Sequence, residues 1–145
     1  MDKSSDYQRL VLILQAAYSG ELAAAYAYRG HWKSLSHPVE REKIRQIENE
    51  EWVHREKVGV MLARLGASPV RTREARMSAI GRTVGLACHL TGRFLPMYFA
   101  GRLESSNVKE YEYAAFHARE SGLISFESEL RVMARVEKEH ETFFL

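Results

Sequence analysis

The chain has 145 residues, of which 46% are hydrophobic and 28% are charged, and its formal net charge is +2. This length allows one domain with a substantial core but not two ordinary domains, so we expect residues 1–145 to fold as a single domain. The small net charge argues against nucleic-acid binding, because the basic residues of such proteins usually cluster into a stripe. The lone cysteine, Cys88, excludes an internal disulfide and any cysteine-based zinc or rubredoxin-type iron centre.

The sequence carries no pattern of a secreted or membrane-spanning protein. Residues 1–6 are polar and no apolar stretch with a cleavage site follows them, so we expect a cytoplasmic protein. The most apolar region, Met77–Gly101, is interrupted by Arg82 and Arg93, and its charge-free runs reach ten residues at most. A membrane span needs about 20. Contact of this region with a membrane surface remains an open alternative.

Proline and glycine divide the sequence into five predicted helices. Alanine, glutamate, arginine and leucine dominate the composition, and no Asn-Gly or Asp-Gly hairpin signal is present. Asp6 is a candidate N-cap of the first helix, and Pro38 suits the first turn of the second. The predicted bounds are about 6–33, 38–66, 73–90, 96–120 and 123 to the end. Connections this short favour antiparallel neighbours, so the expected fold is all-α, a four-helix bundle with an additional helix.

Four of these helices carry a glutamate on an otherwise apolar face. Members of each face are alternately three and four residues apart, as the helical period requires. The glutamates are Glu21, Glu51, Glu104 and Glu137, and two of them are followed by His54 and His140. An unpaired buried carboxylate costs several kcal/mol, and the whole domain is stable by only about 5–15 kcal/mol. Two divalent metal ions would balance four carboxylates, and two neutral imidazoles would complete the ligand set.

The spacing of these residues predicts one shared metal site. Glu51-x-x-His54 and Glu137-x-x-His140 each place two ligands on one helix face, and the upstream glutamates lie 30 and 33 residues earlier. Two antiparallel hairpins would bring all six side chains together, the arrangement of ferritin-like di-iron carboxylate proteins. Carboxylate and imidazole ligands without thiolate favour iron over zinc or calcium, with manganese as the alternative.

Each of these residues alone has a simpler interpretation. A single glutamate is more often a solvent-exposed helix residue, and a single histidine is more often a core residue whose ring nitrogens are hydrogen-bonded. The metal interpretation depends on their joint occurrence on four faces. Other glutamates fall off these faces and are predicted to point into solvent: Glu48, Glu50, Glu56, Glu120, Glu129 and Glu139. His37 is a predicted helix cap, and His89 and His117 are predicted to be structural.

Several motifs beyond the ligand spacing can be compared with a known family. They include Gly20-Glu21 with Ala24, Tyr28 and Gly30, Glu50-Glu51-x-x-His54, Glu104 with Tyr111 seven residues later, and Glu137-x-x-His140. In these motifs the chain resembles the ferritin-like superfamily and most closely the demethoxyubiquinone hydroxylase family of quinone biosynthesis. It departs from that family at His31, where the family has glutamine, and at Glu110, where the family usually has histidine. Rubrerythrins are less similar, because Asn107 stands in place of their second fourth-helix glutamate.

The resemblance implies a ferritin-like di-iron domain that uses dioxygen and two electrons to hydroxylate a hydrophobic, quinone-like substrate. Its two irons would be held by the six residues above, with Glu51 and Glu137 as bridges. Tyr28 and Tyr111 are candidate catalytic residues that orient a ligand or carry hydrogen bonds, or else core aromatics with satisfied hydroxyls. The alternatives are a rubrerythrin-like peroxidase, a ferrous-iron-oxidising protein and a non-catalytic bundle. Met77–Phe99 is a candidate membrane or homodimer contact, and the sequence does not identify the electron donor.

Overall fold

Five helices account for almost all of the computed structural model, which describes residues 3–92 and 94–144. Within these residues there is no strand, so the all-α prediction is confirmed. The helices are α1 (Lys3–Ser34), α2 (Pro38–Arg64), α3 (Arg71–Thr91), α4 (Phe94–Glu120) and α5 (Ile124–Phe144). All lie within a few residues of the predicted bounds, because proline and glycine end helices for local steric reasons.

The helix ends agree with the sequence in one case and differ in another. His37 caps α2 as predicted, with its Nδ1 atom accepting from the backbone N–H of Glu40 at 3.4 Å. Asp6 is not an N-cap, because α1 already begins at Lys3. Instead Asp6 is buried, and its carboxylate lies 2.8 Å from Nδ1 of His117 on α4. This ion pair gives His117 the structural role predicted for it.

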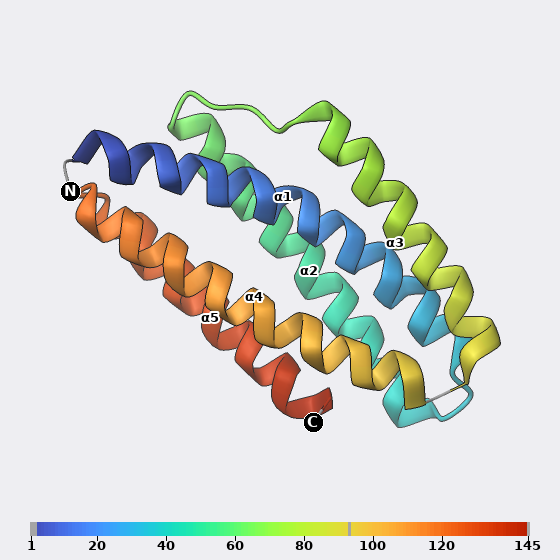
Figure 1. Ribbon diagram of the computed structural model, residues 1–145. Helices are drawn as coiled ribbons and strands as arrows, with labels where there is room; N and C mark the ends of the chain where they lie inside the picture. Colours follow the sequence, from blue (N-terminus) through green and yellow to red (C-terminus); the bar gives the residue numbers. More distant parts are fainter. Residues whose placement is uncertain (1–2, 93, 145) are drawn as a thin grey trace.

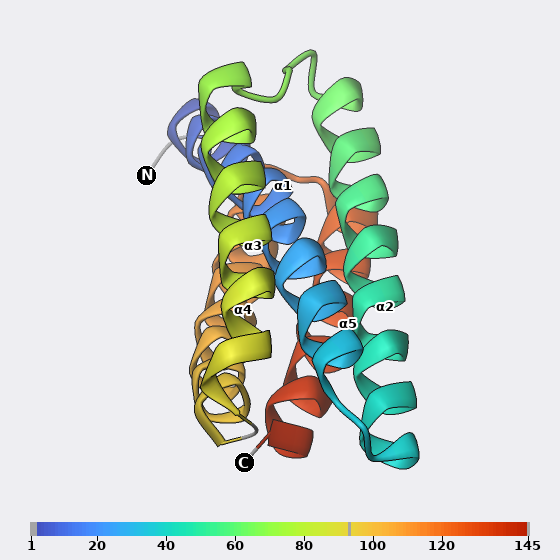
Figure 2. The ribbon, with the colours of Figure 1, turned by 90° about the vertical axis from the view of Figure 1, so that its right-hand side faces the viewer.

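The bundle consists of two antiparallel helix pairs, α1 with α2 and α4 with α5 (Figure 1). α1 lies between α2 and α3, as Figure 2 shows, and also packs against α4. Two apolar clusters fill the interior. One contains Leu14, Met61 and Leu130 near one end of the bundle, and the other contains Ile47 and Phe144 near the opposite end. The inward glutamates lie between these clusters along the helices.

α3 packs closely along the outer side of α1 through small residues. A Cβ atom added to Gly30 would lie 2.2 Å from the Gly85 Cα atom, and one added to Gly81 would lie 2.5 Å from the Ala23 carbonyl oxygen. The two backbones therefore touch without side chains between them. Beyond this contact α3 leaves Leu86 and Leu90 exposed.

Membrane contact remains a prediction. Among the described residues, α1 is the one helix long and apolar enough to cross a membrane by length and composition, and nearly half of that stretch is buried in the bundle. The proposed contact region Met77–Phe99 includes exposed Leu86, Leu90 and Phe99. Arg93, which interrupts that region, lies outside the described residues.

Replacing Gly30 with alanine is expected to destabilise the protein, because the new Cβ atom would meet backbone atoms of Gly85 that cannot move aside. We expect a loss of about 1–3 kcal/mol in the free energy of unfolding, measured by urea denaturation. Gly20→Ala is the matched control on the same helix, since nothing lies within 4 Å of its Cβ position. There alanine is expected to be neutral or stabilising by up to about 1 kcal/mol. Equal stabilities for the two variants would contradict the close α1–α3 contact.

Candidate metal centre

The six predicted ligands come from four different helices and are all buried in the middle of the bundle. α1 supplies Glu21, α4 supplies Glu104, and α2 and α5 each supply a glutamate–histidine pair. The exposed fraction of these side chains is between 0% and 4%. The helical period predicted that these six residues lie on the inward faces of their helices, and the structure shows all six buried there.

Two overlapping groups of ligand atoms form in this position. One contains Glu21, Glu51, His54 and Glu137, the other contains Glu51, Glu104, Glu137 and His140, and within each group the ligand atoms lie within 4.8 Å of one another. Each group can hold a metal ion. Glu51 and Glu137 belong to both groups, which is the placement that bridging carboxylates need.

The two histidines face this cluster from opposite sides through equivalent atoms. His54 Nδ1 lies 2.8 Å from Glu137 Oε1 and 3.8 Å from Glu21 Oε1. His140 Nδ1 lies 3.2 Å from Glu51 Oε1 and 3.6 Å from oxygens of both Glu104 and Glu137. Both imidazoles therefore direct the same nitrogen at the carboxylates.

Polar atoms without partners test whether a cation fits. Among the described residues, eight buried side-chain atoms have no hydrogen-bond partner, and six of them belong to the predicted ligands. The six are Glu21 Oε2, Glu51 Oε1, Glu51 Oε2, Glu104 Oε2, Glu137 Oε2 and His140 Nδ1. Buried polar atoms are normally paired, because each unmade hydrogen bond costs free energy. Metal ions would satisfy these atoms together, so the donor set fits a metal centre.

Burial and crowding shift the pKa values of the metal-free cluster. Burial, with repulsion from neighbouring carboxylates, raises the pKa of Glu51 well above its usual range, and burial raises that of Glu104 to about 9. Burial alone would lower both histidine values, but the carboxylates close to each ring raise the pKa of His54 to about 9 and of His140 to about 10. Burial would raise the pKa of Glu137, yet contacts with a neighbouring carboxyl and both imidazoles hold it below its usual range. Protons therefore take the place of cations in the metal-free state.

The two candidate tyrosines each hold a ligand carboxylate of another helix. The Tyr28 hydroxyl on α1 donates to Glu104 on α4. The Tyr111 hydroxyl on α4 donates to Glu21 on α1 at 2.5 Å. Burial and the nearby carboxylate charges raise the pKa of both phenols, so they remain protonated donors. Their hydroxyls are thus satisfied, and they contact the metal ligands directly.

The prediction that Glu48 points into solvent is wrong, and the prediction for Glu50 holds only in part, because its side chain is 32% exposed and also contacts His140. Glu50 Oε2 lies 2.5 Å from Nε2 of His140, on the side of the ring away from the cluster. Glu48 is buried and accepts hydrogen bonds from the indole N–H groups of Trp32 and Trp52, at 2.8 and 2.6 Å. Both positions flank the inward face, where a neighbouring helix decides whether a side chain is covered. For Glu50 one signal was available. A histidine that binds a metal usually donates its second N–H to a carboxylate, so a carboxylate partner for His140 could have been expected.

An apolar pocket of about 450 Å³ lies between α1, α3 and α4. Its wall includes Tyr28 and His31 from α1, Val84 from α3, and Phe99 and Leu103 from α4. Tyr28 therefore belongs both to this pocket and, through its hydrogen bond, to the metal centre. Among the described residues, no other member of the pocket wall hydrogen-bonds to a predicted ligand.

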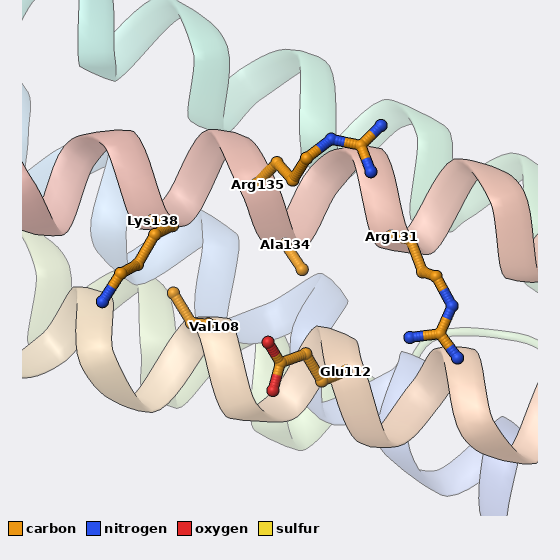
Figure 3. Close-up of a pocket in the computed structure, with 6 residues that line it drawn as sticks. All are labelled: Val108, Glu112, Arg131, Ala134, Arg135 and Lys138. Atoms are coloured by element: carbon orange, nitrogen blue, oxygen red, sulfur yellow. The ribbon is translucent and has the colours of Figure 1, made fainter.

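A second hollow, on the surface between α4 and α5, has a mixed polar and apolar lining and is separate from the predicted ligands. Figure 3 shows Glu112 of α4 and the basic residues Arg131, Arg135 and Lys138 of α5 around it. Arg131 is already paired with Glu127 on its own helix. None of the six predicted metal ligands lines this hollow.

No known family model matches this chain, and comparisons with curated proteins and with solved structures give no significant match. The case for a metal centre therefore depends on the geometry and donor chemistry of these residues alone, which could hold a metal ion. The resemblance to demethoxyubiquinone hydroxylase remains a prediction from the sequence motifs.

In the metal-free protein, the free energy of unfolding is expected to fall as the pH rises. Glu51, Glu104, His54 and His140 all hold protons more tightly in the folded metal-free protein than at their ordinary pKa values of 4.5 and 6.5. The folded state then binds more protons than the unfolded chain, so the free energy of unfolding decreases with rising pH. Glu137 acts in the opposite direction only below its ordinary value of 4.5.

We therefore expect chelator-treated protein to melt at a lower temperature at pH 9 than at pH 6. Metal-loaded protein should not show this loss, because the metal has replaced the protons. Thermal unfolding of both forms in matched buffers measures the difference. Parallel pH profiles for the two forms would contradict the assigned cluster.

Replacing Glu50 with alanine is expected to weaken metal binding by about 10- to 100-fold, because His140 would lose the carboxylate that orients its ring. Glu56→Ala is the matched control, an exposed glutamate on the same helix. Competition with a chromophoric chelator measures both affinities. Similar affinities for the two variants would show that Glu50 does not support the metal centre.

Proposed function

We propose that this protein is a di-iron, oxygen-dependent oxidoreductase that hydroxylates a hydrophobic, quinone-like substrate, as its resemblance to demethoxyubiquinone hydroxylases implies. The observation that carries the proposal is the buried set of four carboxylates and two imidazoles, most of whose facing atoms have no partner among the described residues. An apolar pocket whose wall includes Tyr28, the hydrogen-bond partner of Glu104, supports an organic substrate.

The donor atoms suit iron or manganese, and the proposed reaction with dioxygen favours iron. Hard carboxylate oxygens and imidazole nitrogens suit iron and manganese, and the donor set includes no thiolate. Two bound irons would supply the electrons and the Lewis acidity for dioxygen reduction, which side chains alone do not provide. Glu51 and Glu137 would bridge the ions, with the remaining four ligands divided between them as the two atom groups indicate.

The chain's own residues position the ligands and keep the centre dry. Tyr28 and Tyr111 each donate a proton to a hydrogen bond with a ligand glutamate, which fixes the orientation of that carboxylate. Glu50 fixes the ring of His140 by accepting from Nε2. The apolar clusters on both sides of the centre exclude water, which strengthens every electrostatic interaction within it.

The pocket distinguishes the proposed oxygenase from the peroxidase and iron-oxidising alternatives. Peroxide and ferrous iron are small and polar, and neither needs an apolar cavity. The wall beside Tyr28 is formed mainly by Val84, Phe99, Ala100 and Leu103, which suits a hydrophobic ring or tail. This observation favours an organic substrate that reaches the centre from the α1–α3–α4 side.

Protein made in iron-replete cells is expected to contain about two irons per chain, by elemental analysis, since each of the two ligand groups can hold one ion. With a reductant and dioxygen, it should hydroxylate at least one member of a panel of hydrophobic quinones and phenols, detected by mass spectrometry. Glu51→Ala should lose metal and turnover together, because Glu51 belongs to both groups. Glu56→Ala is again the control.

Two outcomes would contradict this proposal in different ways. Absence of bound metal, even after anaerobic addition of ferrous iron, would leave a structural bundle. In that case Glu51→Ala would fold as well as the wild type or better, because a buried charge is removed. Two bound irons with rapid peroxide consumption and no organic product would instead establish the peroxidase alternative.

A further inference from the structure

His31 is a buried polar side chain that the metal centre does not use. It lies three residues after Tyr28 on α1, is 2% exposed and belongs to the wall of the apolar pocket. Its Nε2 atom is buried and has no hydrogen-bond partner among the described residues. A nitrogen left in this state costs free energy unless some other molecule supplies its hydrogen bond.

The position of the imidazole is held by aromatic stacking. The Phe144 ring stacks with two side chains of α1: with Tyr28 at a centroid distance of 5.7 Å and an interplanar angle of 4°, and with His31 at 6.3 Å and 21°. The side chain is therefore fixed at the pocket before any ligand arrives. Such an arrangement avoids the entropy cost of ordering a flexible side chain on binding.

The other polar groups in the pocket wall are less suited to meeting a ligand. The Tyr28 hydroxyl is engaged with Glu104, and Thr91 lies at the exposed end of α3. Burial lowers the pKa of His31 to about 4, so the ring is neutral near pH 7. A neutral imidazole offers one N–H donor and one acceptor nitrogen, and can therefore pair with a carbonyl or a hydroxyl.

We propose that His31 is a substrate-binding residue that hydrogen-bonds a hydroxyl or carbonyl group on the ring of the molecule held in this apolar pocket. The inference rests on the proposed function, which places an organic substrate there, and adds the polar group by which the ring is oriented. Because Tyr28 in the same pocket wall hydrogen-bonds to Glu104, the substituent bonded to His31 would determine which edge of the ring faces the metal centre.

The test compares two probes that differ by one hydroxyl, 4-butylphenol and butylbenzene. Their dissociation constants are measured by titration calorimetry on the metal-loaded full chain and on variants. His31→Phe keeps an aromatic ring against Phe144 and removes the polar atoms. We expect the dissociation constant of 4-butylphenol, divided by that of butylbenzene, to be about fivefold or more larger in this variant than in the wild type. His31→Gln, which keeps a donor and an acceptor, should retain most of the wild-type ratio.

Leu103→Ala is the control, because it removes apolar surface from the same pocket wall. It should weaken the binding of both probes by similar factors and leave the ratio of their dissociation constants unchanged. An unchanged ratio in His31→Phe, in protein that melts like the wild type, would overturn the role of His31. If His31→Phe does not fold, His31→Leu gives the same comparison.

Metal content measured on the same samples separates the two hypotheses. Two bound irons with no effect of His31 on the probe ratio would refute this inference and leave the proposed function standing. No binding of either probe to the wild-type protein would also refute it. A hydroxyl-dependent ratio in a protein that binds no metal would support His31 and contradict the di-iron function.

Discussion

The burial of four carboxylates at one level of the bundle is the constraint on which the rest of the structure depends. Glu51, Glu104 and Glu137 are completely inaccessible to solvent, so neither water nor counter-ions from solution can screen their repulsion. Apolar clusters on both sides prevent the helices from opening to relieve it. The charge must therefore be neutralised inside, by protons in the metal-free chain or by cations, and cations would also satisfy the orphaned oxygen atoms.

The centre is built by two similar helix pairs. Tyr28 follows Glu21 by seven residues and holds Glu104, whereas Tyr111 follows Glu104 by seven residues and holds Glu21. This reciprocal exchange ties α1 to α4. α3 breaks the symmetry, because it packs along α1 through glycine contacts and thereby forms the apolar pocket on one side of the bundle. The candidate metal centre is thus nearly symmetric, while the apolar pocket lies on one side of it only.

Sequence reasoning succeeded where helical periodicity alone decides the outcome. Glutamates in register with Leu14, Ile47 or Met133 had to face inward, and their common level followed from the lengths of two antiparallel hairpins. Glu48 and Glu50 were missed because they flank the inward face, where burial depends on which neighbour lies alongside. The role of Asp6 was missed for the same reason, since its partner lies on α4, 111 residues away in the sequence. Similarly, the glycines of α3 indicated a helix face of small residues, but the sequence did not identify α1 as the helix that packs against it.

The metal half and the organic half of the proposed function rest on separate observations, and Tyr28 is the residue that joins them. Its hydroxyl holds a ligand carboxylate, while its ring forms part of the pocket wall and stacks on Phe144. A molecule in the pocket that displaced this ring would disturb Glu104 at the same time. In the proposed function, substrate binding and the geometry of the candidate metal ligands would therefore be coupled through one side chain. If the proposed di-iron centre reacts with dioxygen, such a coupling would give the substrate a means of changing the metal site on arrival.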